Sequence, residues 1–218
     1  MLRIILILNF LLFSCAGYEL RDRENPFEVK GIKSISVPMF VNKTNLNSVS
    51  NNFSKEVISM LENFKGLKVY SGNDGKSDAV LLGVVYTTDG YDPIRNKDIA
   101  FLNTEDIEKL KNRSAFTLQT IKSLDVQVRV VILKRPKKEE VDFFINYFDF
   151  NKNMFPQNVF QSNFTLSRNL FIDNSFGDSS GASNPVRGVR NKGIEISNVN
   201  QQATQLASML RSVIINAL

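Results

Sequence analysis

Apolar and polar residues alternate in three stretches of the chain, and this period of two predicts β-strands at residues 32–40, 125–132 and 159–168. In the first stretch Ile35, Val37 and Met39 point one way and the serines between them the other way. Proline has no N–H for a ladder, so Pro38 should lie near the end of this strand or on an edge. These are patterns of strands with one buried face.

The other two alternating stretches have apolar sets of their own, namely Val126, Val128, Val130 and Ile132 in the second and Phe160, Phe164 and Leu166 in the third. Two further strands are predicted without alternation. Residues 67–70 form a short strand, and residues 79–87 form a continuous apolar run, as in a strand that is buried on both faces.

Two segments have the spacing of amphipathic helices. The first has an apolar face made of Phe53, Val57, Ile58, Leu61 and Phe64, and Gly66 is placed where the C′ residue of a helix belongs. The second closes the chain, with Val199, Ala203, Leu206, Ala207, Leu210, Val213, Ile214 and Ala217 at helical spacing.

Three segments have weaker patterns. Residues 89–122 form an irregular section with one short helix near 105–111, acidic at its start and basic at its end. Residues 134–140 form a basic tip that turns the chain back into 141–150, and residues 173–193 are a loop rich in Ser, Asn and Gly.

The order of these elements predicts an α+β fold, with two helices packed on one face of a mostly antiparallel or mixed sheet of about four strands. At 218 residues the chain suits a single domain, which we assign to residues 32–218.

The amino terminus differs from the rest of the chain. Arg3 precedes an apolar run from Ile4 to Phe13, which has the length of the apolar region of a signal peptide and is too short to span a bilayer. The only cysteine, Cys15, follows directly behind Leu12, Phe13 and Ser14, which resemble a bacterial lipobox. We therefore predict a lipoprotein signal peptide at 1–14, lipid attachment at Cys15 and an acylated linker at 15–31.

The composition excludes several classes of site. One cysteine cannot form an internal disulfide or a cysteine metal cluster, and the chain has no histidine to act as a metal ligand or proton carrier. We therefore predict a protein that is not an enzyme and that holds neither a metal nor a cofactor. Residues 72–77 (GNDGKS) contain a fragment of a phosphate-binding loop, but Tyr70 stands where the earlier glycine belongs, and a tight turn is the better interpretation.

The net charge of +5 only slightly favours anionic partners. The sharpest local feature is the basic tip, where Lys134, Arg135, Lys137 and Lys138 lie within five residues. Such a group can bind phosphates, and it can also be a solvated turn that Glu139 and Glu140 partly neutralise.

Three short motifs resemble the lipopolysaccharide-assembly lipoproteins of the LptE (RlpB) type. Residues 15–21 (CAGYELR) are similar to the family's first mature residues, 35–44 (ISVPMFVNKT) to its first strand, and 77–83 (SDAVLLG) to the entry of a later strand. The closing helix also falls where the family has its second helix.

The resemblance implies an outer-membrane lipoprotein that sits as a plug inside an LptD-like β-barrel, helps it assemble and binds lipopolysaccharide during delivery to the cell surface. Ala16 behind the cysteine implies the outer membrane by the enterobacterial sorting rule. For the basic tip, the family resemblance implies lipopolysaccharide phosphates as the ligand. The alternative is an adaptor lipoprotein that activates a cell-wall synthase or builds a secretion pore, because the early strand and helix of such proteins are similar to those expected in this chain. No nucleic-acid partner is expected.

Overall fold

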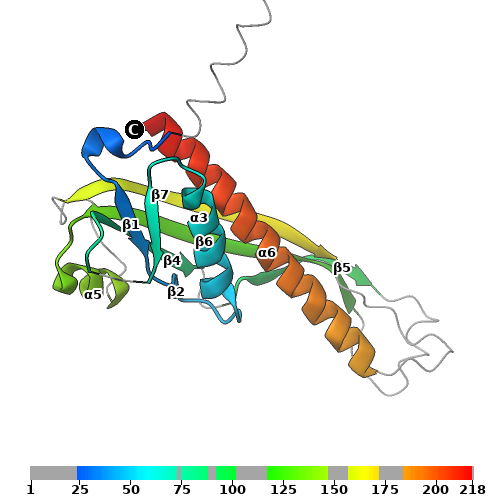
Figure 1. Cartoon of the computed structure of the whole chain (residues 1–218). Helices are drawn as coiled ribbons and strands as arrows, with labels where there is room; N and C mark the ends of the chain where they lie inside the picture. The colour runs from blue at the N-terminus through cyan, green and yellow to red at the C-terminus, as the bar shows by residue number, and fades with distance from the viewer. Residues whose placement is uncertain are drawn as a thin grey trace, which may run out of the picture.

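The computed structural model describes residues 24–72, 75–87, 92–101, 117–146, 157–171 and 184–217. In chain order the elements are a 3-10 helix η1 (Glu28–Lys30), β1 (Ser34–Val37), β2 (Val41–Asn42), α3 (Val49–Glu62), β3 (Lys68–Ser71), β4 (Ala79–Tyr86), β5 (Ile94–Phe101), β6 (Thr117–Lys134), α5 (Lys138–Asn146), β7 (Asn158–Phe171) and α6 (Asn184–Ala217) (Figure 1). Cys15 and the predicted signal peptide lie outside the described residues.

The seven strands in the described ranges all belong to one mixed sheet. β1 pairs in parallel with β3 on one side and with β4 on the other, and β2 also pairs in parallel with β4. The remaining pairs are antiparallel, with β6 bonded to β4, β5 and β7. The α+β prediction is confirmed, but the sheet is larger than the four strands that we expected.

The long strand β6 organises this sheet. Residues 127–134 pair with β4, residues 117–124 pair with β5, and β7 runs along the opposite edge from 121 to 133. β4 and β5 therefore follow one another along the same edge of β6. Figure 1 shows the yellow β7 beside the green β6 over most of its length.

α3 and α6 lie side by side over one face of the sheet (Figure 1). Their buried residues, among them Phe53, Leu61, Leu206 and Leu210, join the inward residues of β1, β4, β6 and β7 in one core. Burial of this apolar surface is the main stabilising term of the fold. Phe27, which lies in the segment that we assigned to the linker, is fully buried in the same core.

The opposite face carries a helix that we did not expect. Residues 138–146 form α5, whereas we expected the chain to turn back at the tip and continue as an extended segment over 141–150. The carboxylate of Glu140 accepts the N–H of Lys137 at 2.7 Å, which caps the first turn. Val141 and Phe144 share one helical face and pack on Val80, Leu82, Val84, Val131 and Leu133. The described part of the chain therefore has three α-helices, and one lies apart from the other two.

The section expected to be irregular contains much of the sheet. Residues 94–101 are β5, and the first residues of β6 also fall within 89–122. Both are held by pairing with strands that are distant in sequence, which local patterns do not report. The helix expected near 105–111 lies outside the described residues.

We expected a loop over residues 173–193, but α6 already begins at Asn184, so residues 184–193 are helical. Its first residues include Pro185, and proline is tolerated in the first turn, where its missing N–H would have no helical partner. The rest of the loop lies outside the described residues.

The other predicted elements are confirmed, with small differences at their ends. β1 ends at Val37, so Pro38 follows the strand, and Met39 is 65% exposed instead of sharing the buried side of Ile35 and Val37. α3 ends at Glu62, and Gly66 therefore lies beyond the helix cap, although its φ of 80° needs a glycine.

Candidate functional site

The four basic residues of the tip do not act as one group. Lys134 is the last residue of β6, and its ammonium donates a hydrogen bond to the backbone carbonyl of Lys30, the last residue of η1. The backbone of Lys137 forms the cap of α5. Arg135 and Lys138 instead line an open depression of about 640 Å³.

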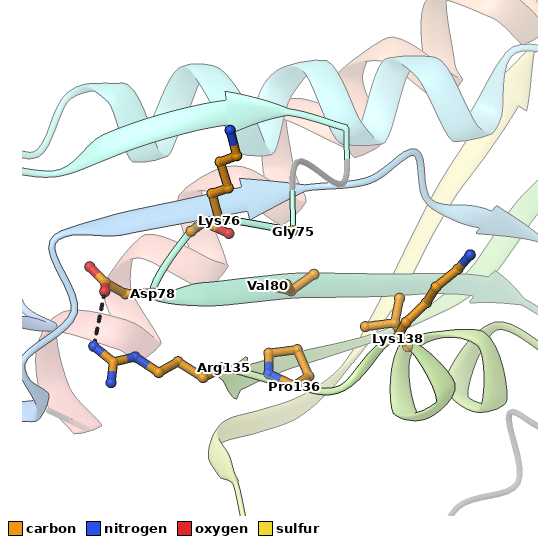
Figure 2. A pocket seen from close by; sticks show the side chains of 9 residues that line it. Gly75, Lys76, Asp78, Val80, Arg135, Pro136 and Lys138 are labelled. Atoms are coloured by element: carbon orange, nitrogen blue, oxygen red, sulfur yellow. Dashed lines mark ion pairs between the residues drawn. The ribbon is translucent and has the colours of Figure 1, made fainter.

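This depression lies between the loop before β4 and the start of α5 (Figure 2). It is lined by Gly75, Lys76, Ser77, Asp78, Val80, Arg135, Pro136, Lys138 and Val141. Lys76 is the residue that sequence reasoning missed, since it belongs to the segment that we interpreted as a tight turn. The pairing of Ala79 with Lys134 brings that segment beside the tip. Only knowledge of this register would have revealed the site.

The depression combines an apolar lining with a basic rim. Val80, Pro136 and Val141 supply the apolar part, and Val80 and Val141 belong to the core beneath α5. In Figure 2 the guanidinium of Arg135 is directed at Asp78, and the ammonium groups of Lys76 and Lys138 point in other directions. The cations are therefore spread around the rim. This arrangement suits a broad amphiphilic anion better than a single phosphate.

Asp78 holds the rim together. Its carboxylate accepts the backbone N–H groups of Lys33 at 3.0 Å and Ser34 at 3.2 Å and the hydroxyl of Ser34 at 3.0 Å. The hydrogen bond from Lys33 is the main reason why the pKa of Asp78 lies below its usual value, and burial opposes this shift. Asp78 therefore joins the starts of β1 and β4.

Arg135 contacts Asp78 twice. Its backbone N–H donates to the Asp78 carbonyl at 2.9 Å, and its guanidinium lies 3.6 Å from the carboxylate. The side chain of Arg135 is 74% exposed, so this ion pair is a weak one. The φ of Arg135 is 46°, in the left-handed region that non-glycine residues seldom adopt, and it accompanies the sharp bend between β6 and α5.

A second groove of about 560 Å³ lies at the end of β1, beside α3. Met39, Lys55, Ile58 and Glu62 are among its lining residues. The charges of Lys55 and Glu62 are opposite in sign, so this groove has no clear electrostatic preference.

The residues that carry the family resemblance have structural roles here. The Phe40 ring packs on Gly83, and the side chain of Asn42 accepts the N–H of Thr44 at 2.9 Å and donates to the carbonyl of Leu46 at 2.8 Å. Asp78 joins two strands, as described above. These motifs therefore explain the fold and do not by themselves mark a ligand site.

The described ranges contain no group of three or more His, Cys, Asp or Glu residues that could hold a metal ion. No helix among the described residues is both long and apolar enough to cross a bilayer. Cys15, the predicted lipid attachment site, lies outside these ranges.

No protein-family model matches the sequence, and no curated protein matches it. Several solved structures resemble the fold at a distance. Rare lipoprotein B from Shewanella oneidensis has 8% identity and a TM-score of 0.38, covering 83% of this chain and 98% of that chain. A PelC dodecamer from Paraburkholderia phytofirmans has 12% identity and a TM-score of 0.38, with 84% and 87% covered. Lipoprotein GNA1162 from Neisseria meningitidis has 9% identity and a TM-score of 0.34, covering 76% of this chain and 98% of that chain. Two of the three are bacterial lipoproteins by name, and these values assign the chain to none of the three families.

Proposed function

We propose that this protein is an acyl-anchored outer-membrane lipoprotein that docks as a plug and assembly factor with an LptD-like β-barrel and helps to deliver lipopolysaccharide to the outer leaflet. The observation that carries the proposal is the depression beside α5, where Lys76, Arg135 and Lys138 surround an apolar lining. Lipopolysaccharide has phosphate groups next to acyl chains, and this surface offers a partner for each.

The amino-terminal sequence supports the same proposal. Cys15 follows an apolar run and a lipobox-like segment, so that processing would make it the first mature residue. One acyl chain holds a protein at a membrane only marginally, because each buried methylene contributes about 0.8 kcal/mol. Three chains on Cys15 would make the attachment effectively permanent.

The role proposed here is not catalytic. The sequence has no histidine, and Cys15, the only cysteine, is assigned to the anchor. Of the charged residues at the depression, Asp78 and Arg135 form an ion pair, and Asp78 also accepts a hydrogen bond from the start of β1. We therefore assign this site to binding, with neither metal nor cofactor.

The alternative is an adaptor lipoprotein of another envelope system, either an activator of a cell-wall synthase or a component of a secretion pore. The exposed Met39 beside the second groove favours it, since an apolar side chain in such a position can contact a protein partner.

The partner decides between the two proposals. The full chain with a carboxy-terminal affinity tag is extracted from membranes with a mild detergent, and the proteins that co-purify are identified by mass spectrometry. Recovery of a large outer-membrane β-barrel protein supports the plug. Recovery of a peptidoglycan synthase or of a ring of identical subunits supports the adaptor.

The anchor is tested separately with Cys15→Ala. We expect this variant to stay folded and to appear in the soluble fraction, because only the acyl chains hold the protein at the bilayer. Retention of Cys15→Ala in washed membranes at the level of the unchanged protein would contradict the anchor.

A further inference from the structure

The outer edge of β7 is the longest strand edge in the described structure that lacks a neighbour. β7 has fourteen residues and, within the described ranges, pairs only with β6. A strand edge of this kind presents a row of N–H and C=O groups that can pair with another strand.

The hydrogen-bond pattern shows which residues present these groups. The N–H of Asp125 donates to the carbonyl of Pro93, just before β5, and the N–H of Lys134 donates to the carbonyl of Gln157, just before β7. On β6, the backbone groups of odd-numbered residues therefore point towards β4 and β5, and those of even-numbered residues point towards β7. In the antiparallel register each even residue of β6 from 126 to 132 faces an even residue of β7. The outward N–H and C=O groups therefore include those of Gln161, Asn163, Thr165 and Ser167.

The outer edge of β7 is less well protected against pairing than the edge at β3. At the other edge, β3 has only four residues and carries Lys68, and short length and lysine are common protections. β7 has neither proline nor lysine, and Arg168 is its only charged residue. Its outward-bonding central part, 159–167, is uncharged.

We propose that this edge pairs with the same edge of a second copy of the chain, in an antiparallel arrangement about a two-fold axis. β7 alternates between Phe160, Phe164, Leu166 and Leu170 towards the helical layer and polar residues on the other face. Pairing of two such strands places apolar residues beside apolar ones and polar beside polar, so the strand is complementary to itself.

An axis through Thr165 satisfies both conditions. It pairs Thr165 with Thr165 and Asn163 with Ser167 of the other copy, and all of these residues have outward backbone groups. It also places Phe164 opposite Leu166 and Arg168 opposite Ser162, so that the two arginines do not meet. This inference concerns a surface other than the depression and does not depend on the proposed function.

The test measures the molar mass of the full chain in non-ionic detergent. Size-exclusion chromatography with light scattering, corrected for bound detergent, is run over a hundredfold range of protein concentration. We expect a dimer that dissociates on dilution. Thr165→Pro removes an outward N–H without removing a bond between β6 and β7, and it should give a monomer with an unchanged circular dichroism spectrum.

Thr165→Lys is a second variant in case the proline prevents folding, since it brings two positive charges close to the axis. Ser71→Lys on the exposed edge β3 is the matched control and should remain a dimer. A monomer at every concentration in the unchanged protein would overturn the proposal. So would a dimer that persists in both Thr165 variants, or one that Ser71→Lys also disrupts.

Discussion

Gly83 lies under the ring of Phe40 in the middle of β4. A Cβ at this position would overlap three ring carbons of Phe40, which is itself buried. A glycine weakens a strand because it has no side chain to pack, and here it provides the space for a large aromatic residue instead. The two residues therefore depend on one another.

We expect Gly83→Ala to lower the free energy of unfolding by about 1–3 kcal/mol, because the added methyl group overpacks the core. Urea unfolding followed by circular dichroism measures this change. In the background of Phe40→Leu the same alanine should cost clearly less, since the smaller side chain leaves room. Equal costs in the two backgrounds would show that the ring is not the obstacle.

Asp78 makes the stability of the protein depend on pH. Its pKa is lower in the folded protein than in the unfolded chain, chiefly because its carboxylate accepts the N–H of Lys33. A lowered pKa gives stability that is present above the unfolded pKa, about 3.9, and is lost as pH falls through the folded value.

We expect Asp78→Asn to lower the free energy of unfolding at pH 7 by about 1–2 kcal/mol, because hydrogen bonds to a charged group contribute about 1.5–3 kcal/mol and solvent screens this partly exposed carboxylate. The difference between the variant and the unchanged protein should shrink as the pH falls below 4. Unfolding curves at a series of pH values test this. A difference that stays constant down to pH 2 would mean that the charge of Asp78 makes no contribution.

At the scale of elements, segments with a clear hydrophobic pattern, either periodic or continuous, were predictable from the sequence, and segments without one were not. β4 is apolar throughout, and the apolar faces of α3 and of the last part of α6 have clear helical spacing. α5 was missed because a stretch with Val141, Phe143 and Phe144 also fits a strand, and its cap at Lys137 and Glu140 decides for a helix. β5 was missed because it depends on pairing with β6, whose partner residues lie from 16 (Phe101 and Thr117) to 30 (Ile94 and Leu124) positions further along the chain.

The first half of α6 was missed for a different reason, its low helix propensity. This part contains Gly188, Gly193 and several asparagines, which cost backbone entropy or favour turns. It is nevertheless helical, as an extension of the well-packed second half.

We therefore expect Gly193→Ala to raise the free energy of unfolding by about 0.5–1 kcal/mol, because Gly193 is a helical residue and a Cβ there meets no atom. Thermal unfolding by calorimetry measures the change. The contrast with Gly83→Ala, the same substitution with the opposite sign, serves as its control. A lower melting temperature for Gly193→Ala would contradict the helical assignment of this segment.

At the scale of the whole molecule, the topology assembles the candidate site. Lys76 and Arg135 are far apart in sequence and meet only because β4 pairs with β6. The sequence indicated the basic tip but could not show which of its four basic residues lie at the site. The structure places Arg135 and Lys138 at the depression. The ammonium of Lys134 bonds instead to the Lys30 carbonyl, and Lys137 caps α5 through its backbone and is not among the residues that line the depression.

This division predicts a difference between two pairs of variants. Under the proposed function, Arg135→Gln with Lys138→Gln should weaken binding to lipopolysaccharide several-fold at low salt, and the loss should diminish as salt is added. Lys134→Gln with Lys137→Gln removes the same charge and should have a smaller effect. Isothermal titration against lipopolysaccharide micelles measures both. Equal losses for the two pairs would mean that only net charge matters.

The succession of β4 and β5 along one edge of β6 has a consequence for local opening. Leu124 lies on β6 where the pairing changes from β4 to β5. The buried side-chain amide of Gln202, on α6, donates a hydrogen bond to the Leu124 carbonyl at 2.8 Å. Beyond this junction β5 pairs, among the described residues, with β6 alone, whereas β4 has β1 and β2 on one side and β6 on the other. Amide protons of residues 94–101 should therefore exchange with deuterium through a partial opening that leaves those of β4 protected, so that a single chain contains two cooperative units of unequal stability.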